Sequence, residues 1–192
     1  MKAALGWFVA LSFIGCGFAQ MVIETFEGGN AESWVVTEGI WSILSPGAAG
    51  SNFCFGSNSL TSETYYEGFR NPEFDLEVYF WIDDESVGNF DIEFNYRDSA
   101  NYYMIDMADP DSDDPTARIY RYIDGVETIL DEIPNVIEAG TWERVAMSRG
   151  FWHIYLIFPD HPPAYLMAID TTFPPVSPIT PTRSVARFAS ST

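Results

Sequence analysis

RIYRYIDGVETIL, residues 118–130, carries the strongest local signal of structure in this 192-residue sequence. Two runs rich in β-branched and aromatic residues flank Asp124-Gly125, and both of these residues tolerate the positive φ angles of a two-residue hairpin turn. A second pattern of this kind, AMSRGFWHIYLIF at residues 146–158, has Gly150 at its turn. The two patterns predict two antiparallel β-hairpins.

The rest of the chain from Val22 onward has the same character. Runs such as FDLEVYFWI, FDIEFNYRD and NYYMIDM are strand-like, and turn-forming segments such as EGGN, SPGAAGSN and DPDSDDP separate them. No long stretch has a helical period. About eleven short strands at this spacing predict one all-β domain over residues 20–192, a two-sheet antiparallel β-sandwich of the jelly-roll type.

The first nineteen residues have a different composition. Met1-Lys2 gives a positive start, an apolar run covers residues 3–14, and small residues lead to Ala19. This is the layout of a secretory signal peptide, and the run is too short to span a bilayer. We therefore expect cleavage after Ala19 and secretion. The alternative, a lipoprotein anchored through Cys16 in FIGC, is less favoured because Phe fits the first position of that motif poorly.

The charge of the predicted mature chain restricts its partners. Eight arginines stand against 28 acidic residues, a formal charge of −20, because the single lysine is Lys2. Such a chain repels nucleic acids and anionic membranes, so we expect no nucleic acid partner and no membrane insertion. Only Cys54 remains after cleavage, so no disulfide can form within the domain. Its hydrophobic core, or a metal ion, must then stabilise it.

Several segments together resemble a known family. ETFEGGNAESWVVTEGIWSI, DIEFNYRDSANYYMIDM, RIYRYIDGVETIL and AGTWERVAMSRGFWHIYLI follow the order found in concanavalin A-like (laminin G-like) jelly rolls, over residues 22–190. The resemblance implies that fold. Such modules usually close with a strand similar to FDNV, whereas this chain ends in ARFASST. The sandwich is therefore expected to lack its final strand or to have an open edge, through which copies could associate.

The alternation Glu73-x-Asp75-x-Glu77 matches the core of the signature of family 16 glycoside hydrolases. That resemblance implies Glu73 as nucleophile, Glu77 as acid/base and Asp75 as an assisting group. However, a retaining pair needs carboxyl groups about 5–5.5 Å apart, whereas Cα atoms four residues apart on a strand are separated by roughly 13 Å. The preferred interpretation is an early strand that opens a sheet. In it the carboxylates face solvent while alternate apolar residues form the core: Phe74, Leu76, Val78, Phe80 and Ile82.

A carbohydrate-binding surface is the alternative use of the same strand. Tyr79 and Trp81 share the face of the carboxylates, and Asp91, Asn95 and Arg97 follow on the polar side of the next strand. Aromatic rings beside hydrogen-bonding side chains suit sugar rings and their hydroxyl groups. The sequence therefore predicts a secreted, non-catalytic carbohydrate-binding or adhesion module. The alternatives are a polysaccharide-cleaving glycoside hydrolase and a structural surface subunit.

The acidic loop DMADPDSDDP contains a calcium-like alternation of Asp109, Asp111 and Asp113. It is not an EF-hand, because Asp114 occupies the glycine position and Tyr120 the position of the bidentate glutamate. A solvated turn is the favoured interpretation. In related sugar-binding modules a structural ion is held by residues at positions like those of Glu24 and Glu27. We therefore expect that no cofactor is required, with Ca²⁺ as the alternative, and no ligand set can be assigned.

Overall fold

A computed structural model gives the fold. It describes residues 5–11, 22–23, 26–45, 47, 52, 54–57, 62–66, 74–81, 89–108, 115–134, 136–150, 152–170 and 187–191. For residues 5–11, 22–23, 66 and 187–191 we describe the backbone alone. The described residues contain strands and turns, and among them there is no helix that could cross a membrane.

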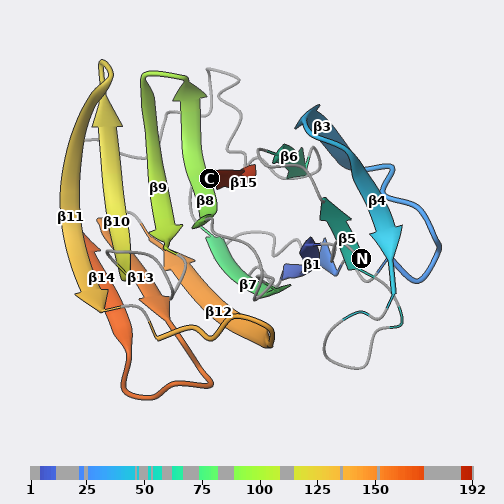
Figure 1. Ribbon diagram of the computed structural model, residues 1–192. Helices are drawn as coiled ribbons and strands as arrows, with labels where there is room; N and C mark the ends of the chain where they lie inside the picture. The colour runs from blue at the N-terminus through green and yellow to red at the C-terminus, as the bar shows by residue number, and fades with distance from the viewer. Residues whose placement is uncertain are drawn as a thin grey trace.

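Two antiparallel sheets pack face to face (Figure 1). The first, sheet A, has the spatial order β14 (Tyr165–Ile169), β13 (His153–Ile157), β12 (Trp142–Arg149), β7 (Phe74–Trp81), β1 (Leu5–Leu11), β5 (Cys54–Ser57) and β4 (Trp41–Leu44), with β2 (Val22–Ile23) paired to β1. The second, sheet B, has the order β11 (Val126–Pro134), β10 (Thr116–Ile123), β9 (Asn101–Met107), β8 (Asn89–Asp98), β15 (Arg187–Ser191), β6 (Ser62–Tyr66) and β3 (Trp34–Glu38). The predicted all-β, two-sheet antiparallel jelly-roll sandwich is confirmed.

The core lies between the sheets and follows the alternation read from the sequence. Along β7, residues from Phe74 to Phe80 alternate between buried and half-buried, so every second side chain enters the core. Phe80 stacks on Phe90 of β8 with ring centroids 4.4 Å apart, and this contact joins the two sheets. The predicted core positions Phe74, Leu76, Val78 and Phe80 are confirmed, whereas Ile82 lies outside the described residues.

Both predicted hairpins are present. Asp124 and Gly125 have φ angles of 50° and 76° and connect β10 to β11, as the sequence indicates. Gly150 connects β12 to β13, and its N–H donates to the carbonyl oxygen of His153 at 3.0 Å. His153 is an exposed residue of β13.

A polar cluster lies between the two sheets, on the inner side of β9 and β10. Arg121 of β10 donates to Asp170, just after β14, with Nη1 2.9 Å from Oδ2, and the Asp170 side chain is 3% exposed. Arg149 of β12 is buried, donates to the carbonyl oxygens of Gly150 and His153, and lies 5.5 Å from the ring centroid of Tyr103. Burial, followed by the charge of Asp170, raises the pKa of Tyr103. The two sheets are thus joined by ionic as well as apolar contacts.

Three strands differ from what the sequence suggested. The stretch 74–81 was expected to open a sheet, but β7 is internal, paired with β12 on one side and β1 on the other. β1 itself lies within the predicted signal peptide and occupies the position between β7 and β5. Within the terminal segment ARFASST, Arg187–Ser191 form β15, which is also internal, because it pairs with both β8 and β6.

Candidate functional site

The outer face of sheet B carries a row of acidic side chains. Phe90, Ile92 and Phe94 of β8 point into the core, so Asp91 and Glu93 lie on the opposite face. Asp91 is directly opposite Asp106 of β9 in the strand register. Both carboxylates are largely buried, with 8% and 7% exposure. Two carboxyl groups are thus held next to each other by the backbone ladder.

This arrangement perturbs the ionisation of Asp91. Burial is the largest cause that raises the pKa of Asp91 well above its usual range, and the charges of Asp106 and Glu93 raise it further. Oδ1 of Asp91 is buried and has no hydrogen-bond partner among the described residues. Arg118 of β10 is opposite Asp106 in the register and forms an ion pair with Glu132, Nε to Oε2 3.1 Å. Among the side chains that the structure describes on this face, carboxylates outnumber arginines.

A bulge interrupts β8 beside this row. The register between β8 and β9 shifts between Phe94 and Asp98, and Asn95 has a positive φ of 50°. Asp98 closes the following turn by accepting from the N–H of Ala100 and from Nδ2 of Asn101, both at 2.9 Å. These hydrogen bonds lower the pKa of Asp98. Bulges redirect side chains and are frequent next to functional sites.

Four tyrosines continue the same face across three strands. Tyr102 of β9 and Tyr122 of β10 are opposite in the register and stack with centroids 4.4 Å apart and planes at 11°. Tyr96 lies 5.8 Å from Tyr102, and Tyr120 lies 6.2 Å from Tyr122. Burial, with the charges of Glu93 and Asp91, raises the pKa of Tyr102 to about 12. The Tyr102 phenol therefore stays protonated at neutral pH, and the Tyr122 hydroxyl donates to Oε2 of Glu127 at 2.6 Å.

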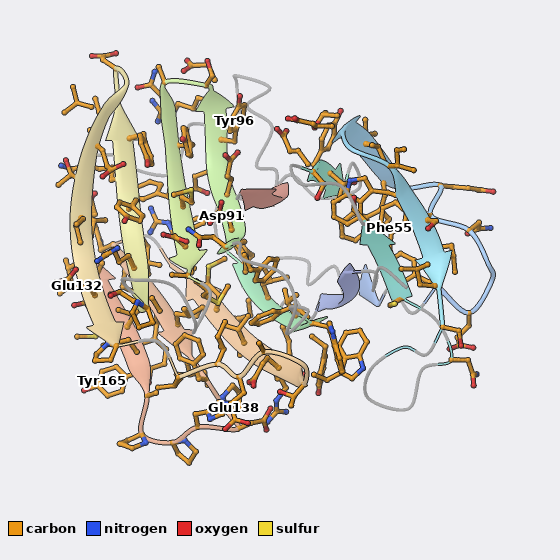
Figure 2. All side chains as sticks on the ribbon, viewed as in Figure 1. Phe55, Asp91, Tyr96, Glu132, Glu138 and Tyr165 are labelled. Atoms are coloured by element: carbon orange, nitrogen blue, oxygen red, sulfur yellow. The ribbon has the colours of Figure 1, made fainter. Side chains whose placement is uncertain are left out.

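We call this surface the tyrosine–carboxylate face. Its members are Asp91, Glu93, Asn95, Tyr96, Tyr102, Asp106, Arg118, Tyr120 and Tyr122. Figure 2 shows Asp91 near the start of β8 and Tyr96 towards its other end. The face combines flat aromatic surfaces with hydroxyl donors and carboxylate or amide acceptors. Such a combination suits a polar ligand with apolar ring faces.

The outer face of sheet A holds a second polar and aromatic group. The guanidinium of Arg144 lies 5.9 Å from the ring centroid of Tyr79, 3.9 Å from Oε1 of Glu77 and 3.3 Å from Oδ1 of Asp160. Burial is the largest cause that raises the pKa of Tyr79. Trp81 packs edge-on against Trp142 of β12, with centroids 5.8 Å apart. These side chains contact one another rather than standing clear of the sheet.

The predicted ligand-binding residues are divided between the two faces. Tyr79 and Trp81 lie on sheet A, whereas Asp91, Asn95 and Arg97 lie on β8 of sheet B. The expectation that they form one platform is therefore wrong. The reason is the connection between β7 and β8, which crosses from one sheet to the other instead of forming a hairpin. Asp91 and Asn95 belong to the tyrosine–carboxylate face, and Arg97 is exposed where β8 ends.

The residues of the glycoside hydrolase alternative are arranged as follows. Asp75 and Glu77 point outward from β7 and are half-buried, opposite Ser148 and Ala146 of β12. Glu77 faces Arg144. Glu73 lies outside the described residues. On the described part of the strand, the carboxylates thus follow the solvent-facing alternation of the preferred interpretation.

Sequence reasoning missed most of the tyrosine–carboxylate face. The alternation in NYYMIDM places Tyr102 and Asp106 on one side of a strand, and this could have been read from the sequence. That Tyr102 lies opposite Tyr122, and Asp91 opposite Asp106, depends on the register between strands. A shift of one residue would have sent each of them into the core.

The calcium hypotheses fall partly outside the described residues. Asp109, Asp111, Asp113 and Glu24 are among the residues without a description. Glu27 accepts hydrogen bonds from the N–H of Asn52 at 2.6 Å and from its Nδ2 at 2.9 Å, so it fixes a loop. The described part of the chain contains no group of three or more His, Cys, Asp or Glu side chains placed to hold a metal ion.

A pocket of about 770 Å³ lies between β11, the edge strand of sheet B, and residues 161–165, which lead into β14, the edge strand of sheet A. Its walls are mainly apolar and include Ile133, Val136 and Tyr165. His161 stands at the wall, with Nε2 2.8 Å from Oε2 of Glu143, a buried carboxylate that also accepts from the N–H of Glu138 at 2.9 Å. The pocket offers a mainly apolar surface with Asp131 and His161 as polar members, and no sequence pattern predicted it.

No protein-family model matches this sequence, and neither does any curated protein sequence. Solved structures do match. The carbohydrate binding module CBM66 from Bacillus subtilis superposes with a TM-score of 0.55 at 15% identity, over 82% of this chain and 86% of the module. A toad ovary galectin in complex with thio-digalactose gives 0.46 at 14% identity, over 69% and 92%. CG-16, a homodimeric agglutinin from chicken liver, gives 0.43 at 12% identity, over 63% and 83%. At such identities the match to the Bacillus module shows the fold alone.

Proposed function

We propose that this protein is a non-catalytic carbohydrate-binding module and that it binds sugar on the tyrosine–carboxylate face. The observation that carries the proposal is the ladder of Tyr96, Tyr102 and Tyr122 beside the carboxylates and the bulge at Asn95. Tyrosine rings give flat apolar contact, and their hydroxyl groups, with Asn95 and Arg118, provide the directional hydrogen bonds that a glycan needs.

The fold supports this proposal. The Bacillus subtilis module, described as carbohydrate-binding, shares the two-sheet sandwich over most of both chains. Because one fold can host unrelated functions, the side chains of the tyrosine–carboxylate face carry the proposal of sugar binding. The finer assignment, a concanavalin A-like module of the laminin G-like kind, is likewise our proposal and rests on the order of the segments described above.

The charge of the site indicates the class of glycan. Asp91, Glu93 and Asp106 stand on one face with Arg118 as the opposing cation among its members. A sulfated or uronic-acid glycan would be repelled by this surface and by the formal charge of −19 of the whole chain. We therefore propose a neutral poly- or oligosaccharide as ligand, bound without an obligatory cofactor.

We also propose that the chain is exported and that residues 1–19 are removed. Cleavage would take β1 out of the position between β7 and β5. Mass spectrometry of the protein released by an exporting host tests this directly, with Gln20 expected as the new N-terminus. A released chain that still contains Leu5–Leu11 would contradict the cleavage.

Binding to a panel of neutral and acidic polysaccharides, measured by calorimetry or affinity electrophoresis, tests the function. We expect saturable binding to a neutral glycan and none to sulfated glycans. Tyr122→Ala should weaken binding about five- to twelvefold, because loss of one stacked ring is worth roughly 1–1.5 kcal/mol. The matched control is Trp81→Ala on sheet A, which should bind as the wild type does.

Two results would contradict the proposal. If Trp81→Ala abolishes binding while Tyr122→Ala does not, the ligand occupies sheet A and the assigned face is wrong. If reducing sugar is released from the bound polysaccharide and Glu77→Gln stops the release, the protein is a glycoside hydrolase. Circular dichroism of each variant confirms that the fold is retained.

A further inference from the structure

The outer face of β14 is apolar although this strand is exposed. Tyr165, Met167 and Ile169 point outward with exposures of 52%, 53% and 74%, while Leu166 and Ala168 between them fill the core. Large apolar side chains that are this exposed and share one strand form a stripe rather than scattered single residues. Apolar stripes of this kind on soluble domains are typical of interaction surfaces.

The stripe continues across the sheet. Tyr155 and Ile157 of β13 lie next to Met167 and Tyr165 in the register, and the rings of Tyr155 and Tyr165 are 5.9 Å apart. On β12 the neighbouring positions are the small uncharged Ala146 and Ser148. None of the outward residues named here on β12, β13 and β14 is a carboxylate, on a chain with 28 acidic residues. Two copies of such an acidic chain can approach closely where neither presents a negative charge.

Strand addition at the edge of β14 is blocked. β11 of sheet B lies beside β14, as Figure 1 shows at the left, and Asp131 of β11 reaches over. Its Oδ2 accepts from the backbone N–H of Met167 at 2.8 Å, and this N–H points away from β13. A carboxylate on the edge prevents another strand from pairing there. Association at this strand must therefore use the face of the sheet and not its edge.

We propose that two copies of this chain pair through the outer face of β13 and β14, with the two-fold axis near Met167. The stripe is self-complementary about that axis, because Tyr165 of one copy then packs on Ile169 of the other. Fully exposed side chains of this size present roughly 150–250 Å² each, so the five apolar residues present about 400 Å². This approaches the ~450–500 Å² of apolar surface that each partner contributes to an interface of standard size.

Sedimentation equilibrium on the purified chain, with no glycan present, tests the proposal. The average mass should rise from one chain towards two as concentration increases. It should rise further with added salt, because salt screens the repulsion between two acidic copies. Met167→Lys should remain monomeric at every concentration at which the wild type is half-associated. Its side chain is already half-exposed, so the variant is expected to fold, and Ile169→Lys is a second variant at the other end of the stripe.

The matched control is Ile40→Lys. Ile40 is an apolar residue in the loop between β3 and β4 and is as exposed as Ile169, so this variant should associate as the wild type does. A wild type that stays monomeric at all concentrations overturns the proposal. So does a dimer that Met167→Lys and Ile169→Lys leave intact. Association that Asp131→Ala strengthens into larger species, with both lysine variants still dimeric, would show that the edge and not the face is used.

Discussion

The ion pair between Arg121 and Asp170 offers the most direct test of how the two sheets are held together. Asp170→Asn keeps the shape of the side chain and removes its charge, so Arg121 loses the carboxylate that lies 2.9 Å from its Nη1. Removal of one partner from a buried pair costs about 3–5 kcal/mol, because the remaining charge stays desolvated. The Arg121 side chain is 21% exposed, which places the expected loss at the low end, about 3 kcal/mol.

Urea denaturation followed by tryptophan fluorescence measures this loss. A loss of 3 kcal/mol corresponds to a melting temperature lower by roughly 6–12 °C in a domain of this size. Asp160→Asn is the matched control, because its ion pair with Arg144 at 3.3 Å lies at the surface and its side chain is 51% exposed. Surface pairs of this kind contribute at most about 1 kcal/mol.

A double substitution measures the interaction between the two charges separately from the other contacts of each side chain. Arg121→Met combined with Asp170→Leu removes both charges, so it should cost less than the sum of the two single changes. The reasoning is refuted if Asp170→Asn is no more destabilising than Asp160→Asn, or if the double variant costs the full sum. Either result would mean that the charges of Arg121 and Asp170 do not stabilise each other in the folded state.

Three further predictions concern single side chains. Asp91 has a raised pKa, so its ionisation lowers stability as the pH rises above about 4, where the unfolded carboxyl titrates. Asp91→Asn should thus raise the melting temperature at pH 7 and change it little at pH 3. An equal change in melting temperature at the two pH values would contradict this. The raised pKa of Tyr102 gives stability that is present below pH 10 and lost between pH 10 and about 12. Ultraviolet titration of the wild type against Tyr102→Phe should show one phenol ionising near pH 12. Gly125→Ala should destabilise by about 1–2 kcal/mol because its φ is 76°, whereas Gly28→Ala, with its nearest atoms 3.8 Å away, should be near neutral in thermal melts.

The amino-acid sequence by itself determined the elements. Period-two alternation along residues 74–80 indicated the buried side of β7, and Asp124-Gly125 indicated the turn between β10 and β11. Both depend on interactions between near neighbours in the chain: the alternating pleat of a strand and the φ angles that a turn requires. Such information is local, so it can be read from a short segment. The all-β sandwich follows from many segments of this kind.

The tertiary structure decided which outward-facing residues belong together. Tyr79 and Asp91 are twelve positions apart and both face outward, yet the crossover between β7 and β8 places them on opposite sides of the sandwich. Tyr102 and Tyr122 are twenty positions apart and stack face to face. A side chain's neighbours across a sheet are set by strand order and register, which the global packing of the core selects. For that reason the candidate site is the tyrosine–carboxylate face of sheet B and not Tyr79 and Trp81 of sheet A.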